Sequence, residues 1–223
     1  MKVFVVIPAF NEAKMIQEVI LQVKPFADEV VVIDDGSKDQ TAALAKKALA
    51  EVLVHKLNRG QGAALQTGIT YALKKGAEII VTFDADGQHD PGDIKKLATV
   101  IGNNQADVCL GSRFIKSENR IPFSKQLLLK SATFFTQLYT GLKITDTHNG
   151  LRAFSAHAAS LIYITQDGMA HASEILEQIS RYNLKYQEIP VTIKYTEYSQ
   201  GKGQKLSGAF QILFDLFLSR ITR

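Results

Sequence analysis

The sequence predicts an α/β domain with a mostly parallel central sheet flanked by helices. Three short runs, residues 3–7, 30–33 and 79–82, are almost continuously apolar, and polar residues follow each of them. Such runs are typical of parallel strands that are buried on both faces. With 223 residues, 46% of them hydrophobic, the chain is long enough to bury one substantial core. We therefore expect a single domain.

The first two strands each end in a polar motif. Residues 3–7 lead into Pro-Ala-Phe-Asn-Glu at 8–12, whose last two residues are polar, and an amphipathic stretch follows at 13–23. Residues 30–33 lead into an Asp-Asp-Gly-Ser sequence at 34–37, after which the chain becomes helical. An isolated Asp-Gly-Ser is a common turn. Ligands of open parallel sheets bind beyond the carboxyl ends of the strands, however, so polar motifs repeated at these ends indicate a binding edge.

A glycine-bearing loop, residues 58–68, follows the apolar run 52–54. Glycine lets the backbone approach a ligand closely, and a helix that begins near Gly62 would point free N–H groups at an anion. The glycine spacing fits neither a dinucleotide fingerprint nor a P-loop. Helix capping accounts for the loop equally well.

The residues after the run 79–82 place two carboxylates and an amide at alternate positions, Asp84, Asp86 and Gln88. If the backbone stays extended beyond the strand, their oxygens project to one side. Oxygen ligands suit Mg²⁺ or Mn²⁺, which usually complete their shell with phosphate. The implied substrate is a polyphosphate ester. The alternative is a strand-to-helix turn in which Asp90 and Pro91 start the next helix.

The sequence after residue 105 predicts two further strands and two amphipathic helices. Residues 106–110 and 189–193 have the composition of strands, and apolar residues recur at helical spacings over 123–142. The helix at 123–142 suits a position at a membrane or ordinary core packing equally well. Residues 206–221 form a second pattern of this kind, with a broad apolar face and a narrow polar stripe.

Charge is divided unevenly along the chain. Residues 1–112 carry 12 Lys and Arg against 14 Asp and Glu, whereas residues 113–223 carry 14 against 8. A basic second half suits an anionic ligand or an anionic membrane surface, although a solvated basic surface explains most of these residues as well. The basic residues are scattered without an aromatic reader motif, so we expect no nucleic-acid partner.

The sequence also bears on the compartment. The chain begins directly with the first strand, so we expect no secretory leader, and no stretch reaches the length of a membrane-spanning helix. A single cysteine, Cys109, fits a reducing compartment. We therefore expect a cytoplasmic protein that is peripheral at the inner face of the membrane.

Several motifs occur together in a fixed order. They are Pro8-Ala9-Phe10-Asn11-Glu12, Asp34-Asp35-Gly36-Ser37 with Asp39, Asn58-Arg59-Gly60-Gln61-Gly62-Ala63-Ala64, Asp84-Ala85-Asp86-Gly87-Gln88-His89 and Gly111-Ser112-Arg113-Phe114. Together they resemble the inverting nucleotide-sugar glycosyltransferases of family two, most closely the branch of dolichyl- and polyprenyl-phosphate hexosyltransferases. The resemblance implies one GT-A domain over residues 1–200, followed at 201–223 by a basic loop and an amphipathic helix.

The resemblance also implies roles for individual residues. The metal, Mg²⁺ or Mn²⁺, would be bound by Asp84, Asp86 and Gln88 and would neutralise the departing diphosphate. The catalytic set would be Asp86, Arg113 and Asp146, with the Arg113 guanidinium binding two phosphate oxygens at once. The nucleotide-sugar-binding set would comprise Pro8, Ala9, Asn11, Glu12, Asp34, Asp35, Gly62, Asp84, Ala85, Asp86, Arg113 and Lys202.

Residues on the acceptor side follow from a second motif, residues 145–154, which resembles the Asp-x-x-x-Gly-Phe/Leu-Arg/Lys element of the family. Asp146 would remove a proton from a hydroxyl acceptor, whereas a phosphate acceptor is already an anion and leaves Asp146 a positioning role. Glu174 is an alternative base or a helix-surface acid. Lys125 is a candidate for the acceptor phosphate, and Lys202 or Lys205 would touch the diphosphate when the basic loop closes.

The sequence thus predicts transfer of a hexose, from a GDP-mannose or UDP-glucose type of donor, to a polyprenyl phosphate with inversion of the anomeric centre. Two alternatives stay open: a hydroxyl acceptor in cell-wall or surface polysaccharide synthesis, and a sugar-nucleotide-binding module without turnover. A homodimer, or a membrane-protein partner bound through residues 206–221, is also left open.

Overall fold

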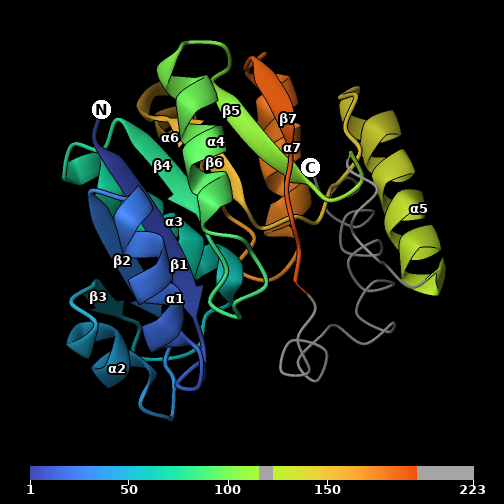
Figure 1. The fold of residues 1–223 in the computed structure, drawn as a ribbon. Helices are drawn as coiled ribbons and strands as arrows, with labels where there is room; N and C mark the ends of the chain where they lie inside the picture. The colour runs from blue at the N-terminus through green and yellow to red at the C-terminus, as the bar shows by residue number, and fades with distance from the viewer. Residues whose placement is uncertain (116–122, 195–223) are drawn as a thin grey trace.

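A seven-stranded sheet forms the centre of the molecule (Figure 1), and its strand order is β3-β2-β1-β4-β6-β5-β7. The computed structural model describes residues 1–115 and 123–194. In these ranges β6 is antiparallel to both of its neighbours, and the other strands run parallel to one another. The strands are β1 (Val3–Ala9), β2 (Glu29–Asp34), β3 (Glu51–Val54), β4 (Ile79–Thr82), β5 (Val108–Ser112), β6 (Arg152–Ser155) and β7 (Tyr186–Pro190).

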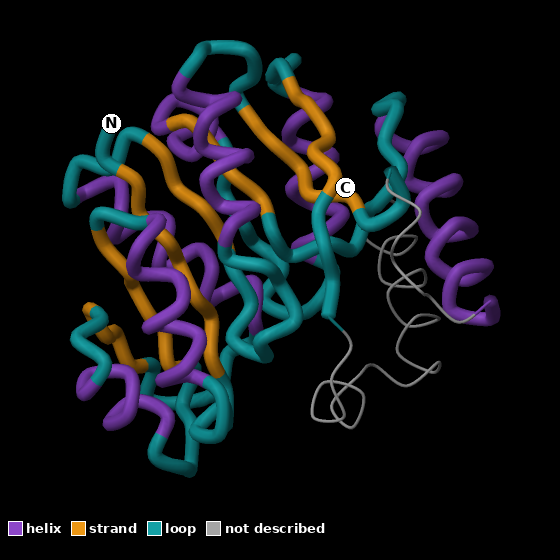
Figure 2. Tube along the Cα trace, viewed as in Figure 1, coloured by secondary structure: helices purple, strands orange, loops and turns teal. Residues whose placement is uncertain are grey.

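Helices cover both faces of this sheet. In Figure 1, α1 and α4 lie in front of the strands, α3, α6 and α7 lie behind them, and α5 stands beside the β7 edge. Figure 2 shows the same alternation of strand and helix along the first half of the chain. The helices are α1 (Ile16–Val23), α2 (Thr41–Lys47), α3 (Gln61–Lys74), α4 (Gly92–Gly102), α5 (Phe123–Thr140), α6 (Ala156–Leu161) and α7 (His171–Arg181), with a short 3₁₀ turn at Lys24–Phe26.

The core consists of two apolar layers, one on each face of the sheet. On β1, Val5 and Ile7 pack towards α1 and α4, whereas Phe4 and Val6 pack towards α3, α6 and α7. This alternation follows from the period of two along a strand. Because both faces are covered, the central strands have no polar face, which explains their continuous apolar runs. The fold class predicted from those runs is confirmed.

The strand order explains why the polar motifs meet. The order reverses between β1 and β4, and the register places Asp34 level with Ala9 at the carboxyl ends of β1 and β2. The antiparallel strand β6 begins at Arg152, which pairs with the last residue of β4, Thr82. The segment that precedes β6 is therefore brought to the same edge as the loops that follow β1, β2, β4 and β5, at the lower edge in Figure 1.

The later elements differ in detail from the sequence-based expectation. The last strand lies at Tyr186–Pro190 rather than 189–193, and α5 ends at Thr140, where Gly141 adopts a positive φ of 72°. The predicted amphipathic segment 206–221 and the domain boundary at residue 200 lie outside the described residues. Among the helices of residues 1–115 and 123–194, none is long and apolar enough to cross a bilayer.

Candidate functional site

The loop after β4 turns instead of staying extended. The strand ends at Thr82, residues 85 and 86 form a turn, and Gly87 adopts a positive φ of 74°. The Gln88 N–H donates to Asp86 Oδ1 over 3.0 Å and closes the turn. The expected row of three oxygens on one side of an extended chain is therefore wrong, because glycine permits a reversal directly after the second carboxylate.

Asp84 is held from two sides. Its Oδ1 accepts a hydrogen bond from Gln61 Nε2 at 3.1 Å, and its Oδ2 accepts one from His89 Nε2 at 2.9 Å. Gly150 packs against the carboxylate so closely that a Cβ at this position would lie 2.3 Å from Oδ2. Burial alone would raise the pKa of Asp84. The hydrogen bond from His89 and the charge of His89 lower this pKa by more than burial raises it, so the pKa lies below its usual value. Asp84 is a fixed, ionised carboxylate.

Asp86 is the carboxylate with a spare oxygen. Burial raises its pKa, and the negative charge of Asp84 raises it further. Its Oδ1 accepts from the Gln88 N–H, whereas Oδ2 has no hydrogen-bond partner in the part of the chain that the structure describes. A divalent cation would relieve the repulsion between the two carboxylates. These residues therefore fit a metal of the Mg²⁺ class, which prefers oxygen ligands.

The described side chains do not form a complete metal cage. No group of three or more His, Cys, Asp and Glu residues in 1–115 and 123–194 is placed to hold an ion. Mg²⁺ and Mn²⁺ typically bind through one or two carboxylates and take their other ligands from water and substrate phosphate. An incomplete protein shell around Asp86 is what this kind of site requires.

Asp35 supports the glycine loop. Its Oδ1 accepts from His55 Nδ1 at 2.7 Å and from the Arg59 N–H at 3.0 Å, and its Oδ2 accepts from the Gly60 N–H at 2.7 Å. The residue is 3% exposed. It therefore offers little surface for the nucleoside contact that we expected. Asp34, its neighbour, accepts from the Ser37 N–H and closes the turn after β2.

The N-terminus of α3 is not open to an anion, contrary to expectation. The N–H groups of Gly62 and Ala63 both donate to the Asp167 carbonyl, at 2.8 and 3.4 Å. A Cβ at Gly62 would lie 2.0 Å from the Gln166 carbonyl oxygen. The glycines of this loop thus permit close packing of the segment 166–168, and that segment uses the N–H groups that we expected to be free.

Glu174 holds this covering segment. Its carboxylate accepts from the N–H and hydroxyl groups of Thr165 and, at 2.9 Å, from the Gln166 N–H. The side chain is buried in α7, so it is not the helix-surface acid that the sequence allowed. Its hydrogen bonds also occupy both oxygens. Glu174 is thus a poor candidate for the base.

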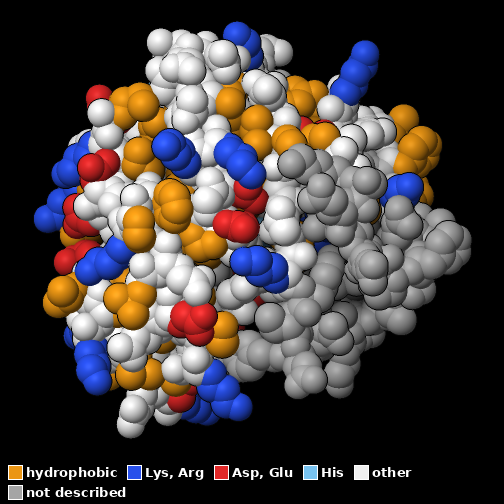
Figure 3. Space-filling model, viewed as in Figure 1, with side chains coloured by type: hydrophobic (Ala, Val, Ile, Leu, Met, Phe, Trp, Pro, Cys, Tyr) orange, Lys and Arg blue, Asp and Glu red, His pale blue; other side chains and the backbone are white. Residues whose placement is uncertain are grey.

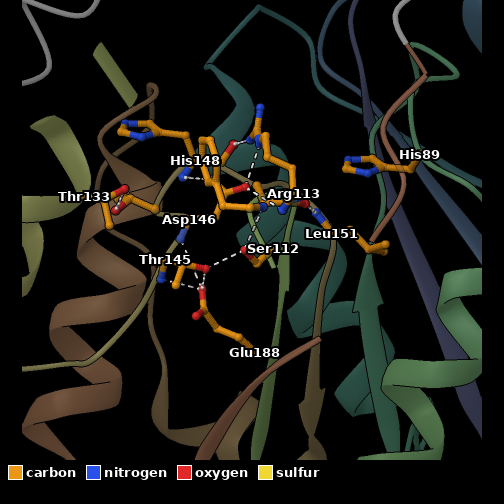
Figure 4. Close-up of polar contacts among 12 residues, drawn as sticks. His89, Ser112, Arg113, Thr133, Thr145, Asp146, His148, Leu151 and Glu188 are labelled. Atoms are coloured by element: carbon orange, nitrogen blue, oxygen red, sulfur yellow. Dashed lines mark hydrogen bonds and ion pairs between the residues drawn. The ribbon is translucent and has the colours of Figure 1, made fainter. Parts of the chain in front are cut away.

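Arg113 and Asp146 form a buried ion pair (Figure 4). Arg113 Nε donates to Asp146 Oδ2 over 2.6 Å, and the Arg113 backbone N–H donates to the same oxygen over 3.1 Å. The Asp146 Oδ1 accepts from the His148 N–H, and Arg113 Nη2 donates to the His148 carbonyl at 3.0 Å. Asp146 is 3% exposed. These contacts favour the positioning role of Asp146 over proton removal.

Two further residues organise this loop. Glu188 of β7 accepts from the N–H groups of Thr145 and Asp146, at 2.8 and 3.1 Å (Figure 4), and burial raises its pKa. Arg152 donates to the carbonyls of residues 147, 149 and 172 from a fully buried position. Burial lowers the pKa of Arg152 to about 10, so it remains a cation at neutral pH. The segment before β6 is therefore fixed on several sides.

The other predicted site residues lie around this edge. Pro8 and Ala9 end β1, and Ala85 is buried between the two carboxylates. Asn11 accepts from the Lys38 N–H at 2.8 Å, and the Glu12 N–H donates to Thr41 Oγ1, so the loops after β1 and β2 are joined. Lys202 and Lys205, together with the side chain of Lys125, lie outside the described residues.

The sequence did not predict the residues that form hydrogen bonds with the acids and loops of the site. Gln61 and His89 hold Asp84, His55 holds Asp35, and Glu188 holds the Asp146 loop. His89 has a local signal, because it follows the carboxylates within the same loop. The other three are 20 or more residues from the groups that they bind, and no spacing rule connects them.

Comparison with known proteins gives a consistent result. Glycosyl transferase family 2 matches residues 4–162. The UDP-N-acetylglucosamine--dolichyl-phosphate N-acetylglucosaminyltransferase of Methanococcus voltae is 33% identical over 243 residues, which cover 98% of this chain and 96% of that protein. The polyprenol monophosphomannose synthase of Mycolicibacterium smegmatis is 30% identical over 219 residues, which cover 93% of this chain and 82% of that protein.

Solved structures share the fold. Glucosyl-3-phosphoglycerate synthase from Mycobacterium tuberculosis, crystallised with Mn²⁺, UDP and glucosyl-3-phosphoglycerate, superposes with a TM-score of 0.77. The match covers 98% of this chain and 79% of that chain at 20% sequence identity. The mostly parallel sheet flanked by helices is the GT-A fold of this structure.

The ion pair generates a stability prediction. Replacing Asp146 by Ala leaves the buried Arg113 guanidinium without its carboxylate, so the free energy of unfolding should fall by about 3 kcal/mol or more. Asp167→Ala is the matched control, because its pair with Arg59 is half exposed on both sides and should contribute less than about 1 kcal/mol. Urea denaturation measures both. Equal stability of the two variants would contradict a supporting role for Asp146.

Proposed function

The chain belongs to glycosyl transferase family 2, and from this premise we propose that it transfers a hexose from a nucleotide-diphosphate sugar to a polyprenyl phosphate. The observation that carries the acceptor is the similarity over almost the whole chain to two transferases whose names specify dolichyl phosphate and polyprenol. The names of those two proteins specify different sugars, so we propose a hexose donor without naming which hexose it carries.

The site supports a phosphate acceptor on chemical grounds. A hydroxyl acceptor requires a base within hydrogen-bond reach, whereas a phosphate is already an anion at neutral pH. Both candidate bases, Asp146 and Glu174, are buried and hydrogen-bonded to the protein. A phosphate acceptor is itself the nucleophilic anion and needs no base. It therefore suits a site in which Asp146 and Glu174 hold the surrounding loops by hydrogen bonds.

We propose that Asp86 holds a divalent metal, with Asp84 and Gln88 beside it. Bound there, Mg²⁺ or Mn²⁺ would stabilise the negative charge of the diphosphate as the sugar leaves. The glucosyl-3-phosphoglycerate synthase of the same fold was crystallised with Mn²⁺ and UDP, and also with Mg²⁺ and UDP. The spare oxygen and the raised pKa of Asp86 support its role as the principal protein ligand.

Arg113 is proposed to bind phosphate oxygens. Its orientation is set by Asp146 on one side and by the His148 carbonyl on the other. A guanidinium fixed in this way presents a planar set of donors without a further cost in side-chain entropy. The loops that contain Asn11, Glu12 and Asp34 lie at the same edge and are proposed to hold the nucleoside. Lys202, from the basic loop, would contact the diphosphate.

The exposed face of α5 supports membrane association. The helix directs Thr133, Thr136 and Thr140 into the domain, whereas Phe134 and Leu138 are 61% and 76% exposed. Figure 3 shows apolar side chains over α5 at the right of the view, with a basic side chain beside them. Helices of water-soluble domains normally have the opposite arrangement, with the apolar face inward.

We propose that this face, formed by Phe134, Phe135, Leu138 and Tyr139, lies on an anionic lipid surface. Lys130 is exposed one turn before Phe134 on the same side of the helix, and the second half of the chain carries a net charge of +6. An apolar face with basic neighbours is the pattern of helices that bind anionic membrane interfaces. A prenyl phosphate acceptor would be delivered from such a surface.

The acceptor proposal is tested by transfer assays with the purified protein. UDP-glucose, UDP-N-acetylglucosamine and GDP-mannose, each labelled in the hexose, should be offered with Mn²⁺ and a polyprenyl phosphate. We expect one donor to label the lipid, and the prenyl alcohol of equal length to stay unlabelled, because the phosphate is the nucleophile. Labelling of the alcohol, or of free saccharides in place of the lipid, would show a hydroxyl acceptor.

The metal proposal predicts a specific loss in Asp86→Asn. Ligands that bind the native state raise its melting temperature, so Mn²⁺ should increase the thermal shift caused by UDP or GDP, and Asp86→Asn should remove that increase. Asp90→Asn is the control, since Asp90 lies in the same loop and caps Gly92. Because the pKa of Asp86 is raised, protons should compete with Mn²⁺ as the pH falls through that pKa. A Mn²⁺ effect retained in Asp86→Asn would refute the assignment.

The membrane proposal predicts that charge-neutral changes on α5 release the protein from lipid. The double variant Phe134→Ser and Leu138→Ser should bind vesicles containing anionic lipid at least tenfold more weakly, because two exposed apolar anchors are lost. Leu21→Ser on α1 is the control, with a 55% exposed side chain on another face. Co-sedimentation measures binding. Unchanged binding of the double variant, with loss on truncation after Lys194, would assign lipid binding to the C-terminal segment instead.

A further inference from the structure

His171 is a buried residue at the site edge that none of the roles above uses. It is the first residue of α7 and is 6% exposed. It packs against the start of α3 so closely that a Cβ at Gly62 would lie 3.0 Å from the Cβ of His171. The charges of Asp84 and Arg152 are near enough to act on its ring. His171 therefore lies between the α3 N-terminus and the carboxylate at the end of β4.

The proton of His171 is located by its neighbour. Nδ1 lies 2.8 Å from the Gly168 carbonyl oxygen, and a carbonyl oxygen accepts but does not donate, so Nδ1 holds the hydrogen. Burial lowers the pKa of His171 to about 4, so the ring is neutral at pH 7. The other nitrogen, Nε2, then carries a lone pair, and it has no hydrogen-bond partner among the described residues.

This chemistry selects the kind of group that His171 can bind. Nε2 is an acceptor, and the nearby Asp84 carboxylate also accepts, so the region between His171 and Asp84 favours a ligand with hydrogen-bond donors. Phosphate oxygens at neutral pH are acceptors, so they cannot donate a hydrogen bond to Nε2. Hydroxyl groups of a sugar supply donors without charge. Nε2 is not sealed inside the protein without a partner, so a hydroxyl that reaches it would form one neutral hydrogen bond, with a net gain of about 0.5–1.5 kcal/mol.

We propose that Nε2 of His171 accepts a hydrogen bond from a hydroxyl of the donor hexose and thereby contributes to the choice of sugar. The inference rests on the proposed function, because it takes the donor to be a nucleotide sugar. It adds a residue of the helix α7 to a site that otherwise consists of loops after the strands. A fixed acceptor of this kind discriminates between sugars because a donor lacking the hydroxyl leaves the nitrogen unpaired.

The test compares three ligands on three proteins. Calorimetry should measure the binding of UDP, UDP-glucose and UDP-N-acetylglucosamine, or of GDP and GDP-mannose, to the unaltered chain, His171→Phe and His157→Phe. His157 is an exposed histidine on α6 and serves as the control. We expect His171→Phe to weaken the preferred nucleotide sugar roughly three- to tenfold, which is the loss of one neutral hydrogen bond, and to leave the free nucleoside diphosphate unchanged.

A double cycle that combines deoxy-sugar donors with the His171 variants identifies which hydroxyl His171 binds. The cycle compares ligands on the same protein, so a change in the folding stability of a variant does not affect the result. For one ring position, removal of the hydroxyl should weaken binding to the unaltered chain but not to His171→Phe, and His171→Gln, which keeps an acceptor, should fall between them. The inference would be overturned if removing each hydroxyl weakened binding equally in all the proteins. It would also be overturned if His171→Phe weakened binding of UDP as much as that of the nucleotide sugar, because His171 would then contact the ribose. If the unaltered chain binds no nucleotide sugar, the proposed function fails instead.

Discussion

Buried carboxylates that bind backbone N–H groups hold the functional edge of this protein together. Three buried acids, Asp35, Asp146 and Glu174, accept hydrogen bonds from a loop on another element. Glu188 is half-buried and acts in the same way. A carboxylate without hydrogen bonds is costly to bury, so each acid stays buried only while its loop is in place. The converse also holds, because the N–H groups of these loops would otherwise lack partners. These hydrogen bonds therefore fix the loops at this end of the sheet.

The carboxylates at this edge differ in how many of their oxygens the protein itself binds. The oxygens of Asp35, Glu174 and Asp146 accept hydrogen bonds from the protein, and these side chains have little exposed surface. Asp86 differs, because burial and the neighbouring Asp84 raise its pKa and one of its oxygens is unpaired in the described chain. Repulsion between two carboxylates that the fold holds close is a store of free energy that cation binding releases. Asp86 is thus an acid whose ionised form the fold disfavours.

The sequence predicted the architecture well and the detailed contacts poorly, for physical reasons. Continuous apolar runs can only be buried between two layers, so residues 3–7, 30–33 and 79–82 indicated parallel strands. The turn at Gly87 was missed because glycine allows an extended or a reversed chain equally. The use of the Gly62 N–H depends on a carbonyl more than 100 residues away, at Asp167. The orientation of α5 was also undetermined, since its periodicity shows that one face is apolar but not whether that face points inward.

Helix α7 connects the two halves of the site. Through Glu174 it holds the segment that closes the start of α3, and through the Ala172 carbonyl it receives a hydrogen bond from Arg152, which fixes the loop of Asp146. His171, at its first turn, is oriented by Gly168 of the same covering segment. A small shift of α7 would therefore move the support of the glycine loop, the loop that orients Arg113 and the imidazole together. Because the protein interior is close-packed and transmits strain, one helix mechanically couples the glycine loop and the Asp146 loop, although their residues are far apart in the sequence.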